Sequence, residues 1–301
     1  MSDLAAARRH YAEEIKYRGQ ISSSRLLRAF AGVPRERFLG DGPWRIRSEI
    51  VHDYWSTEDA DPVHLYHDVL VAIDEDRKLD NGLPSLWARL IDVLDVKENE
   101  RVVQVGCGPG YYSAILSEVV GPAGTVVAID YEEGFIQRAR RNLQECRNVE
   151  VIHGDACRDV GGPADVIIVH AGFNHPHRLW LDSLRPHGRL MVPLTNHDRQ
   201  GTLFKITRLD AGYRVEAVRR IEIFPGHGRG NTAIDERVTR WWEAMSRVRS
   251  LRRDAHEKDH TCWLHAEDFC LSTQFPDGED GVPASSTGTS SSSREASADR
   301  R

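Results

Sequence analysis

The stretch VVQVGCGPGYYSAIL, residues 102–116, decides the fold. Its first four residues predict a buried strand, and the apolar run from Tyr111 predicts a helix. Between them, Gly106, Gly108 and Gly110 form a turn in which the backbone can approach a ligand and the N–H groups of the helix N-terminus face it. The third glycine comes one residue earlier than in the dinucleotide fingerprint, so the spacing disfavours nicotinamide and flavin cofactors.

Acidic residues stand at the ends of the next two predicted strands. Asp130 ends the run VVAID, 20 residues after Gly110, where an acidic side chain in such folds meets ribose hydroxyls. Asp155, in HGDA, ends the third strand, from which a side chain can reach an adenine amino group. One glycine loop is a weak signal, but three strand ends in phase predict a nucleoside-containing cofactor.

The surrounding sequence alternates short apolar strands with amphipathic helices. This alternation predicts an α/β fold with a doubly wound, mainly parallel, Rossmann-like sheet. A hairpin over 201–225 is expected to extend the sheet at its edge, followed by a charged helix over 233–253 and a last strand within 262–273. The predicted strands of the parallel core are 101–106, 124–130, 149–155, 164–172 and 188–194, and its predicted helices are 86–94, 111–121, 132–146 and 177–184.

The chain divides into four parts by composition and pattern. Residues 1–85 predict N-terminal helices, with Ser capping in SSSRLLRAF, and an irregular lid that ends in a loop. Residues 86–230 form the cofactor-binding core, and 231–276 a C-terminal helix and strand extension. Residues 277–301 are rich in Gly, Asp, Ser and Thr and are expected to be disordered.

Composition excludes several classes of protein. The 301 residues are 40% hydrophobic, which is enough for a full core. With 40 basic and 46 acidic side chains, the net charge of -6 predicts no nucleic-acid partner. No window approaches the roughly 18 apolar residues of a membrane span, and five scattered cysteines fit a reducing compartment, so a cytoplasmic protein is expected. The oligomeric state is left open.

Histidines and cysteines recur near the C-terminal end. His260, Cys262, His265 and Cys270 are residue types that zinc accepts, in the spacing H-x-C-x2-H-x4-C. This spacing matches no standard structural site, and the intervening residues alternate like a strand. The sequence therefore predicts no metal site.

Taken in order, these motifs resemble one family of class I S-adenosylmethionine-dependent methyltransferases, the protein-L-isoaspartate O-methyltransferases. The resemblance covers roughly residues 20–230 and implies the fold, the cofactor S-adenosyl-L-methionine and methyl transfer to a protein or peptide. The stretches that carry it are SSSRLLRAFAGVPRERFL, LYHDVLVAI, VVQVGCGPGYYSAIL, HGDA, LRPHGRLMVPL and EIFPG.

The resemblance also implies cofactor-binding residues. Three glycines shape the pocket for the methionine part, two residues after the second strand hold ribose and flank adenine, and two residues after the third strand border the base. These positions are Gly106, Gly108, Gly110, Asp130, Tyr131, Asp155 and Ala156.

The loop RKLDNGLPS, residues 77–85, departs from the family pattern. The family carries Thr-Ile-Ser followed by x-Pro, with the serine at the reacting centre, whereas this chain has Asn81 and Gly82 before Pro84. Asn81 offers a donor and an acceptor, and Gly82 removes bulk, so both are candidate catalytic residues. Ser85 follows the proline and fits a helix cap, with replacement of the missing serine as an alternative. The alternative interpretation of the whole loop is a solvated surface turn without a function.

His170 ends the fourth predicted strand, at the carboxyl edge where open α/β sheets bind ligands. It is a third candidate catalytic residue, either contacting the acceptor or acting as the base for a hydroxyl or amine. A neutral packing histidine is the competing interpretation.

These observations predict an S-adenosylmethionine-dependent O-methyltransferase that acts on a carboxylate of a protein, peptide or peptide natural product. A carboxylate is already an ionised nucleophile, so in-line positioning suffices and the missing serine leaves the chemistry possible. Three alternatives remain open: genuine isoaspartyl repair, O- or N-methylation of a small molecule, and a non-catalytic cofactor-binding adaptor.

Overall fold

The fold is that of a computed structural model that describes residues 3–51, 53–228, 230, 234, 236, 238–239, 242–253 and 255–276. The segment 277–301, for which the sequence predicts disorder, lies outside the described residues. Within the described ranges, no helix is both long enough and apolar enough to span a lipid bilayer.

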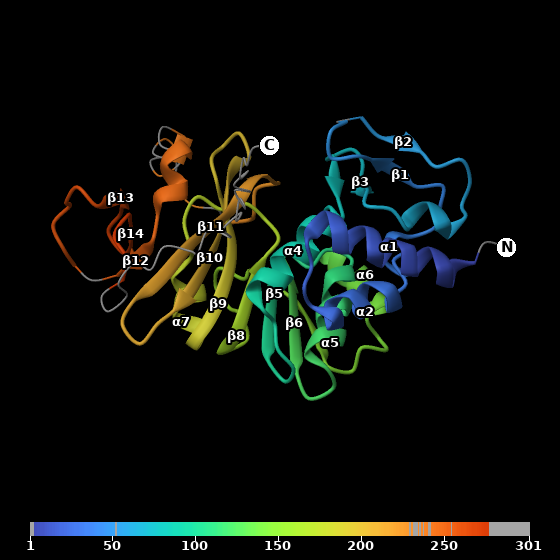
Figure 1. Ribbon diagram of the computed structural model, residues 1–301, viewed down its shortest axis with the longest axis horizontal. Coiled ribbons are helices and arrows are strands. Elements are labelled where there is room, and N and C mark those ends of the chain that lie inside the picture. The colour runs from blue at the N-terminus through green and yellow to red at the C-terminus, as the bar shows by residue number, and fades with distance from the viewer. Residues whose placement is uncertain are drawn as a thin grey trace, which may run out of the picture.

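A ten-stranded sheet runs through the part of the chain that the structure describes, in the order β13-β14-β12-β11-β10-β9-β8-β5-β6-β7 (Figure 1). Strands β7, β6, β5, β8 and β9 are parallel neighbours, which confirms the predicted parallel core. The strands of this core are β5 (Arg101–Val105), β6 (Thr125–Asp130), β7 (Val149–His153), β8 (Ala164–Val169) and β9 (Leu184–Thr195).

Each strand of the core serves two hydrophobic layers, because successive side chains point to opposite faces. Val102 packs into one layer and Val103 into the other. Three helices cover the first face: α4 (Pro84–Leu94), α5 (Tyr111–Val120) and α6 (Glu133–Asn142). Helix α7 (Arg178–Ser183) covers the second face, where Trp180 is fully buried. Both faces of a parallel sheet need such cover because its strands are apolar throughout.

The N-terminal helices pack outside the first helical layer. They are α1 (Leu4–Gly19), α2 (Ser24–Gly32) and the short α3 (Glu36–Leu39). The predicted serine cap is present, since the Oγ of Ser23 accepts the backbone N–H of Leu26 at 3.2 Å. Tyr11 and Phe30 are fully buried, in edge-to-face contact at 6.2 Å between ring centroids.

A buried arginine connects these helices to the lid. Arg35 is fully buried, and its guanidinium donates to the carbonyls of Leu65, His67 and Val69 at 2.8, 3.0 and 2.8 Å. A buried charge is tolerated when several oxygens accept its donors. The three bonds fix the start of strand β3 (Leu70–Asp74), from which the chain enters the loop 77–85.

A four-stranded sheet in the order β2-β1-β3-β4 forms most of the lid, above the core in Figure 1. The sequence predicts short, irregular structure here, as observed. Its elements are β1 (Arg45–Arg47), β2 (Trp55–Ser56), the 3-10 helix η1 (Pro62–Leu65), β3 (Leu70–Asp74) and β4 (Leu79–Asp80).

The far part of the sheet is antiparallel. The predicted hairpin is confirmed as β10 (Gln200–Arg208) and β11 (Tyr213–Glu222). The prediction that it forms the edge of the sheet is wrong, because a further strand pairs with β11. Strand β12 (Ser250–Arg252) pairs with β11, within a segment predicted as helix. The single last strand expected within 262–273 is instead a hairpin of β13 (Cys262–His265) and β14 (Cys270–Ser272), and the 3-10 helix η2 (Trp242–Arg247) precedes β12.

Candidate active site

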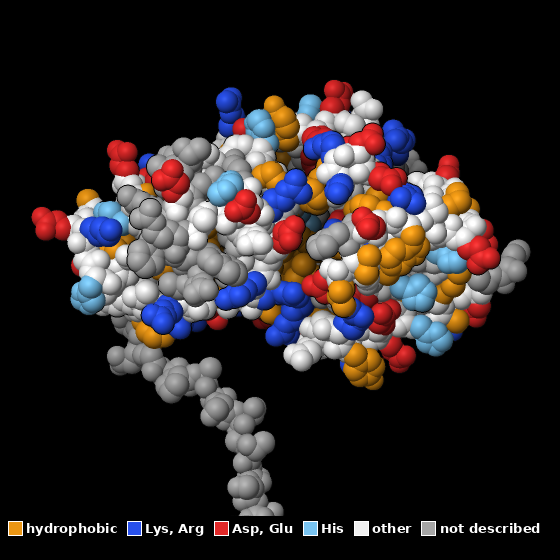
Figure 2. All heavy atoms as spheres, turned by 90° about the horizontal axis from the view of Figure 1, so that it is seen from above, with side chains coloured by type: hydrophobic (Ala, Val, Ile, Leu, Met, Phe, Trp, Pro, Cys, Tyr) orange, Lys and Arg blue, Asp and Glu red, His pale blue; other side chains and the backbone are white. Residues whose placement is uncertain are grey.

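A cavity of about 870 Å³ opens at the carboxyl ends of β5, β6, β7 and β8, beneath the lid sheet. Strand β5 has β6 on one side and β8 on the other, so this is the point at which the strand order reverses and open α/β sheets bind ligands. The volume lies within the range of small-molecule pockets. On the face shown in Figure 2, acidic and basic side chains of the described residues are interspersed.

The glycine turn forms the floor of this cavity. Gly106 and Gly108 line it, with φ angles of 78° and 54° that favour glycine. Gly110, by contrast, does not line the cavity. A Cβ at Gly110 would lie 2.7 Å from Leu143 Cδ1, so this glycine lets helices α5 and α6 approach each other.

Asp130 lies at the end of β6, facing the glycine turn. Its Oδ2 accepts the backbone N–H of Gly108 at 2.8 Å, and its Oδ1 accepts that of Glu132 at 3.0 Å. Burial raises the pKa of the Asp130 carboxyl, and the two N–H donors act against that shift. The carboxylate is thus held in place beside the cavity, with the remaining lone pairs of both oxygens available to hydroxyl donors.

Tyr131 lies on the cavity wall next to Asp130. Tyr131 is 52% exposed, and its ring stacks on that of His227, at 3.7 Å between ring centroids and an angle of 11°. His227 follows the last strand of the family-like region, and the sequence offered no signal for this contact. One face of Tyr131 is therefore covered, which leaves the other face for stacking with a ligand.

Asp155 and Ala156 follow β7 and line the same cavity. The Oδ1 of Asp155 accepts the backbone N–H of Cys157 at 2.9 Å, and the carbonyl of Ala156 accepts the indole N–H of Trp180 at 2.8 Å. These bonds fix the turn after β7, so the third predicted strand end lies at the cavity with the first two.

The loop before α4 brings Asn81 and Gly82 to the cavity. The backbone N–H of Asn81 donates to the carbonyl of Val71 at 2.8 Å. Asn81 is only 8% exposed, and its buried side-chain Nδ2 has no hydrogen-bond partner among the described residues. A buried amide donor without a partner costs free energy unless a ligand accepts from it.

Gly82 fits beneath the indole of Trp87. Its φ angle is 75°, and an added Cβ would lie 2.7 Å from Trp87 Cδ1 and closer still to Nε1. The carbonyl of Gly82 accepts the hydroxyl of Tyr112 at 3.1 Å. Position 82 therefore has no room for a side chain in this loop conformation.

His170 lines the cavity at the end of β8 and packs between aromatic rings. It stacks on Trp87 at 3.6 Å between ring centroids and 4° between ring planes, and lies 5.4 Å from Tyr112. Burial lowers the pKa of His170 to about 3, so the ring is neutral near pH 7. A base with so low a pKa removes protons poorly, and the geometry favours the packing interpretation.

Ser85 does not face the cavity. Its Oγ donates to Asp68 Oδ2 at 2.6 Å and its backbone N–H donates to Oδ1 at 2.8 Å, and Asp68 also pairs with Arg18 at 2.6 Å. The hydroxyl is thus engaged in a buried network on the helix side of Pro84. This arrangement speaks against Ser85 as a replacement for the missing serine.

Basic residues at the cavity are partly neutralised. Arg77 binds both carboxylate oxygens of Glu132, at 2.6 and 2.8 Å, and Arg47 pairs with Asp80 at 2.9 Å. Arg199, which the sequence did not single out, also lines the cavity, with its guanidinium 4.8 Å from the ring centroid of Phe224. Trp87 and Tyr112 also line the cavity, although the sequence did not indicate it, because an aromatic residue at the start of a helix is typical of the hydrophobic core.

The C-terminal histidines and cysteines are arranged differently from the expectation. His260 is exposed, whereas His256, Cys262, His265 and Cys270 converge far from this cavity, with one ligand atom from each within 4.8 Å of the others. The strand alternation that separated them in the sequence is interrupted by a bulge between Cys262 and Leu264.

Comparison with known sequences identifies relatives of this fold and site. The model of the family described as protein-L-isoaspartate(D-aspartate) O-methyltransferase matches residues 6–225. A protein-L-isoaspartate O-methyltransferase of Aeropyrum pernix is 29% identical over 222 residues, covering 72% of this chain and 77% of the relative. One of Methanothrix thermoacetophila is 30% identical over 181 residues, covering 59% and 77%.

Solved structures show the same fold. A protein-L-isoaspartate O-methyltransferase gives a TM-score of 0.62 at 24% identity, covering 77% of this chain and 68% of that chain. A Plasmodium falciparum protein described as a member of the same enzyme class, in complex with S-adenosyl-L-homocysteine, gives 0.57 at 18% identity, covering 72% and 97%. The family match ends before the C-terminal extension, at residue 225.

Proposed function

The chain belongs to the protein-L-isoaspartate(D-aspartate) O-methyltransferase family, and from this premise we propose that it methylates a side-chain carboxylate of a protein or peptide. It is an S-adenosylmethionine-dependent methyltransferase with the class I fold.

The cavity fits the cofactor by its own features. Its floor is a turn of glycines, a carboxylate held by two backbone N–H groups stands at the end of β6, and its volume is about 870 Å³. In this proposal Gly106 and Gly108 admit the methionine part, Asp130 accepts ribose hydroxyls, and Tyr131 stacks on the base through its free face. Asp155 and Ala156 border the base. The bound cofactor supplies an electrophilic methyl group on a sulfonium.

The acceptor side of the proposal depends on Asn81. Asn81 lines the cavity, and its Nδ2, which is buried in this loop conformation, has no hydrogen-bond partner among the described residues; this observation carries the assignment. In this proposal a small shift of the loop on acceptor binding exposes the amide, and a carboxylate oxygen of the acceptor then satisfies this donor and is oriented by it. Gly82 keeps the loop close to Trp87 and allows a bulky peptide to approach.

The chemistry of the cavity suits an acceptor that is already ionised. Burial raises the pKa of Cys107 and Tyr112 well above their ordinary values and lowers that of His170 to about 3, so all three side chains are neutral near pH 7. Deprotonation of a hydroxyl or amine by these groups is unfavourable. A carboxylate needs no base, and holding it in line with the methyl group while water is excluded accounts for the rate.

A panel of acceptors tests the proposal. The full chain is incubated with methyl-labelled S-adenosylmethionine and peptides that differ only in aspartyl, isoaspartyl or asparaginyl at one position, alongside hydroxyl and amine metabolites. We expect a base-labile methyl ester on an aspartyl or isoaspartyl peptide and none on the asparaginyl control. Labelled metabolites without labelled peptides would sink the proposal, and cofactor binding without any methylated product would favour an adaptor.

Isoaspartyl repair is the second candidate, favoured by the relatives, which are named protein-L-isoaspartate O-methyltransferases. It is distinguished in the same panel, because repair requires turnover of the isoaspartyl peptide and little of the aspartyl one. Because Gly82 replaces the family serine, we expect this chain to accept both aspartyl and isoaspartyl peptides, a broader range than repair alone requires.

We further propose how the parts of the chain divide the work. Residues 1–85 form the acceptor-facing lid, 86–230 the cofactor-binding core, and 231–276 an extension that completes the second face of the sheet. A reducing compartment such as the cytoplasm fits the five free cysteines.

A further inference from the structure

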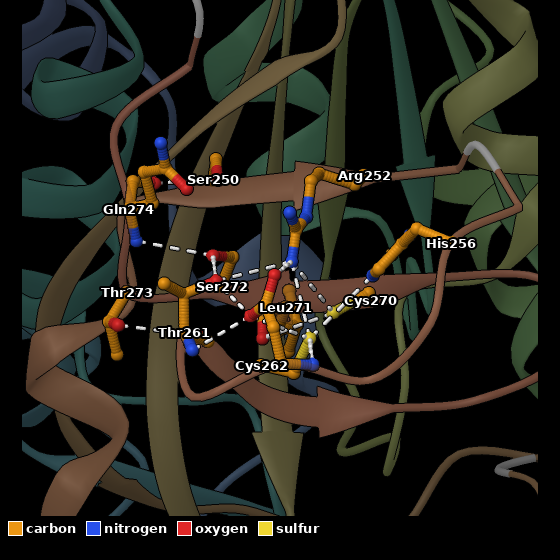
Figure 3. A network of polar contacts seen from close by, with 11 residues as sticks. Ser250, Arg252, His256, Thr261, Cys262, Cys270, Leu271, Ser272, Thr273 and Gln274 are labelled. Atoms are coloured by element: carbon orange, nitrogen blue, oxygen red, sulfur yellow. Dashed lines mark hydrogen bonds and ion pairs between the residues drawn. The ribbon is translucent and has the colours of Figure 1, made fainter.

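Four potential metal ligands meet at the end of the sheet farthest from the cofactor cavity. One ligand atom each from His256, Cys262, His265 and Cys270 lies within 4.8 Å of the others. Figure 3 shows His256, Cys262 and Cys270 pointing toward one another, from the loop after β12 and from strands β13 and β14. All four residues lie beyond position 225, where the family match ends.

The hairpin geometry explains why these side chains share one side. His265 and Cys270 are directly opposite partners in the β13–β14 ladder, so their side chains point the same way. Cys262 precedes His265 by three residues, which in a regular strand would place them on opposite faces. The bulge between Cys262 and Leu264 adds one residue and resets the alternation. Cys262 is thereby turned toward the other two ligands.

His256 closes the group from the loop between β12 and β13. Its Nε2 lies 3.6 Å from the Sγ of Cys262, and its ring meets that of His265 edge to face at 4.8 Å between centroids. With Zn–S of about 2.3 Å and Zn–N of about 2.1 Å, a tetrahedral ion separates sulfur and nitrogen ligands by about 3.6 Å. The pair is therefore at the spacing that a shared tetrahedral ion requires.

We propose that these four residues bind a structural zinc ion. Two thiolates and two imidazoles form the Cys2His2 set that suits zinc, and the absence of a carboxylate among the four disfavours magnesium and calcium. Four protein ligands fill the coordination positions of the ion and leave none open for a substrate, so the ion takes no part in methyl transfer. Its binding converts two thiols to thiolates with release of their protons.

Two neighbouring donors support the thiolates, whereas the protonated Cys262 thiol donates to Asp259 Oδ1 at 3.3 Å. The Nη2 of Arg252 lies 3.2 Å from Cys262 Sγ and 3.8 Å from Cys270 Sγ (Figure 3). The backbone N–H of Asp259 points to Cys262 Sγ at 3.4 Å. Arg252 is held in turn by Asp259, at 3.7 Å, and by Thr261, at 3.3 Å. Donors of this kind stabilise negative charge on coordinated sulfur and orient the ligands.

The ion explains how so small an extension holds its shape. Strands β12, β13 and β14 have three or four residues each, yet Leu251, Leu264, Phe269 and Leu271 are buried against the second face of the sheet. Strands of this length are marginal without additional support. One zinc ion would connect the loop, β13 and β14 at a single point. This role is separate from the proposed methyl transfer and does not depend on it.

The test is metal analysis of the full, untagged chain purified without chelator. Inductively coupled plasma mass spectrometry should find about one zinc per chain, as a four-ligand site requires. Cys262→Ser and His256→Ala should lose most of that zinc. The matched controls Cys146→Ser and His260→Ala, which change residues outside the group, should retain it.

A cobalt experiment covers the case in which a ligand variant fails to fold. The wild-type chain is freed of metal under reducing conditions and titrated with Co²⁺, which should give the visible bands of a tetrahedral ion and thiolate-to-metal charge transfer. Zinc absent from the purified chain together with no such bands would overturn the proposal. So would a Cys262–Cys270 disulfide that persists in the chain purified under reducing conditions, or equal zinc loss from His260→Ala and His256→Ala.

Discussion

Replacing Gly82 by alanine probes the contact between the loop and Trp87. Two costs are expected: a left-handed backbone at φ of 75°, worth roughly 1–2 kcal/mol for a residue with a Cβ, and overpacking against the indole at 2.7 Å, typically about 1–3 kcal/mol. The free energy of unfolding should therefore fall by about 2–5 kcal/mol, the sum of these two costs.

Gly212→Ala provides the matched control. Gly212 has a similar φ of 81°, but the nearest atom to its added Cβ is a carbonyl oxygen at 3.9 Å, so only the backbone cost of about 1–2 kcal/mol applies. Thermal unfolding, followed with and without S-adenosylhomocysteine, measures both variants, at roughly 2–4 °C per kcal/mol for a domain of this size. Gly82→Ala should melt at the lower temperature and should also lose acceptor turnover. Equal melting temperatures would refute the reasoning about Trp87.

Three further predictions follow from the site. Asp130→Ala should weaken S-adenosylhomocysteine binding by about 1.5–3 kcal/mol, roughly 10- to 150-fold, in calorimetry, because ribose hydroxyls lose their acceptor; unchanged affinity would remove Asp130 from the site. Burial lowers the pKa of His170 from 6.5 to about 3, so the folded protein favours the neutral ring. The contribution of this neutral ring to the free energy of unfolding is complete above pH 6.5 and is lost as the pH falls from there toward 3. In denaturant unfolding, His170→Asn should therefore lose less stability than the wild type between pH 7 and pH 5. The pKa values of Asp80 and Asp130 are also raised, but both proteins contain these residues, so they do not affect the difference. Arg77→Ala should change turnover little, because Glu132 already neutralises this guanidinium at 2.6 Å; a large rise in KM for acidic peptides would show that Arg77 leaves Glu132 to bind substrate.

The parallel core could be predicted because its signals are local. Apolar runs, a glycine turn and acidic residues at strand ends repeat at a regular spacing, and Asp130 and Asp155 lie at the cavity that this spacing implies. Gly110 belongs to the same motif, but its contact with Leu143 depends on how two helices pack, which sequence spacing does not reveal.

The remaining parts depend on contacts between distant segments. Strand β12 is three residues long inside a charged stretch, so neither its length nor its composition distinguishes it from a helix. The bulge at Cys262 reverses the expected alternation, and His256 enters the group in place of His260 through the course of a loop. At the cofactor cavity, the Trp87–His170 stack and the Tyr131–His227 stack arise from tertiary packing alone.

In the proposed mechanism, the loop 77–85 presents a carboxylate to the methyl donor through Asn81. The most direct measurement is kcat/KM for a peptide substrate that the wild type methylates, compared among wild type, Asn81→Ala and Asn81→Asp. The affinity for S-adenosylhomocysteine is determined for each of the three proteins. A lost hydrogen bond to a charged group predicts a decrease of about 1.5–3 kcal/mol, roughly 10- to 150-fold, for Asn81→Ala. A larger decrease is expected for Asn81→Asp, whose carboxylate repels the acceptor, with cofactor affinity unchanged in both. Undiminished kcat/KM in Asn81→Ala, or a loss explained entirely by weaker cofactor binding, would contradict the account.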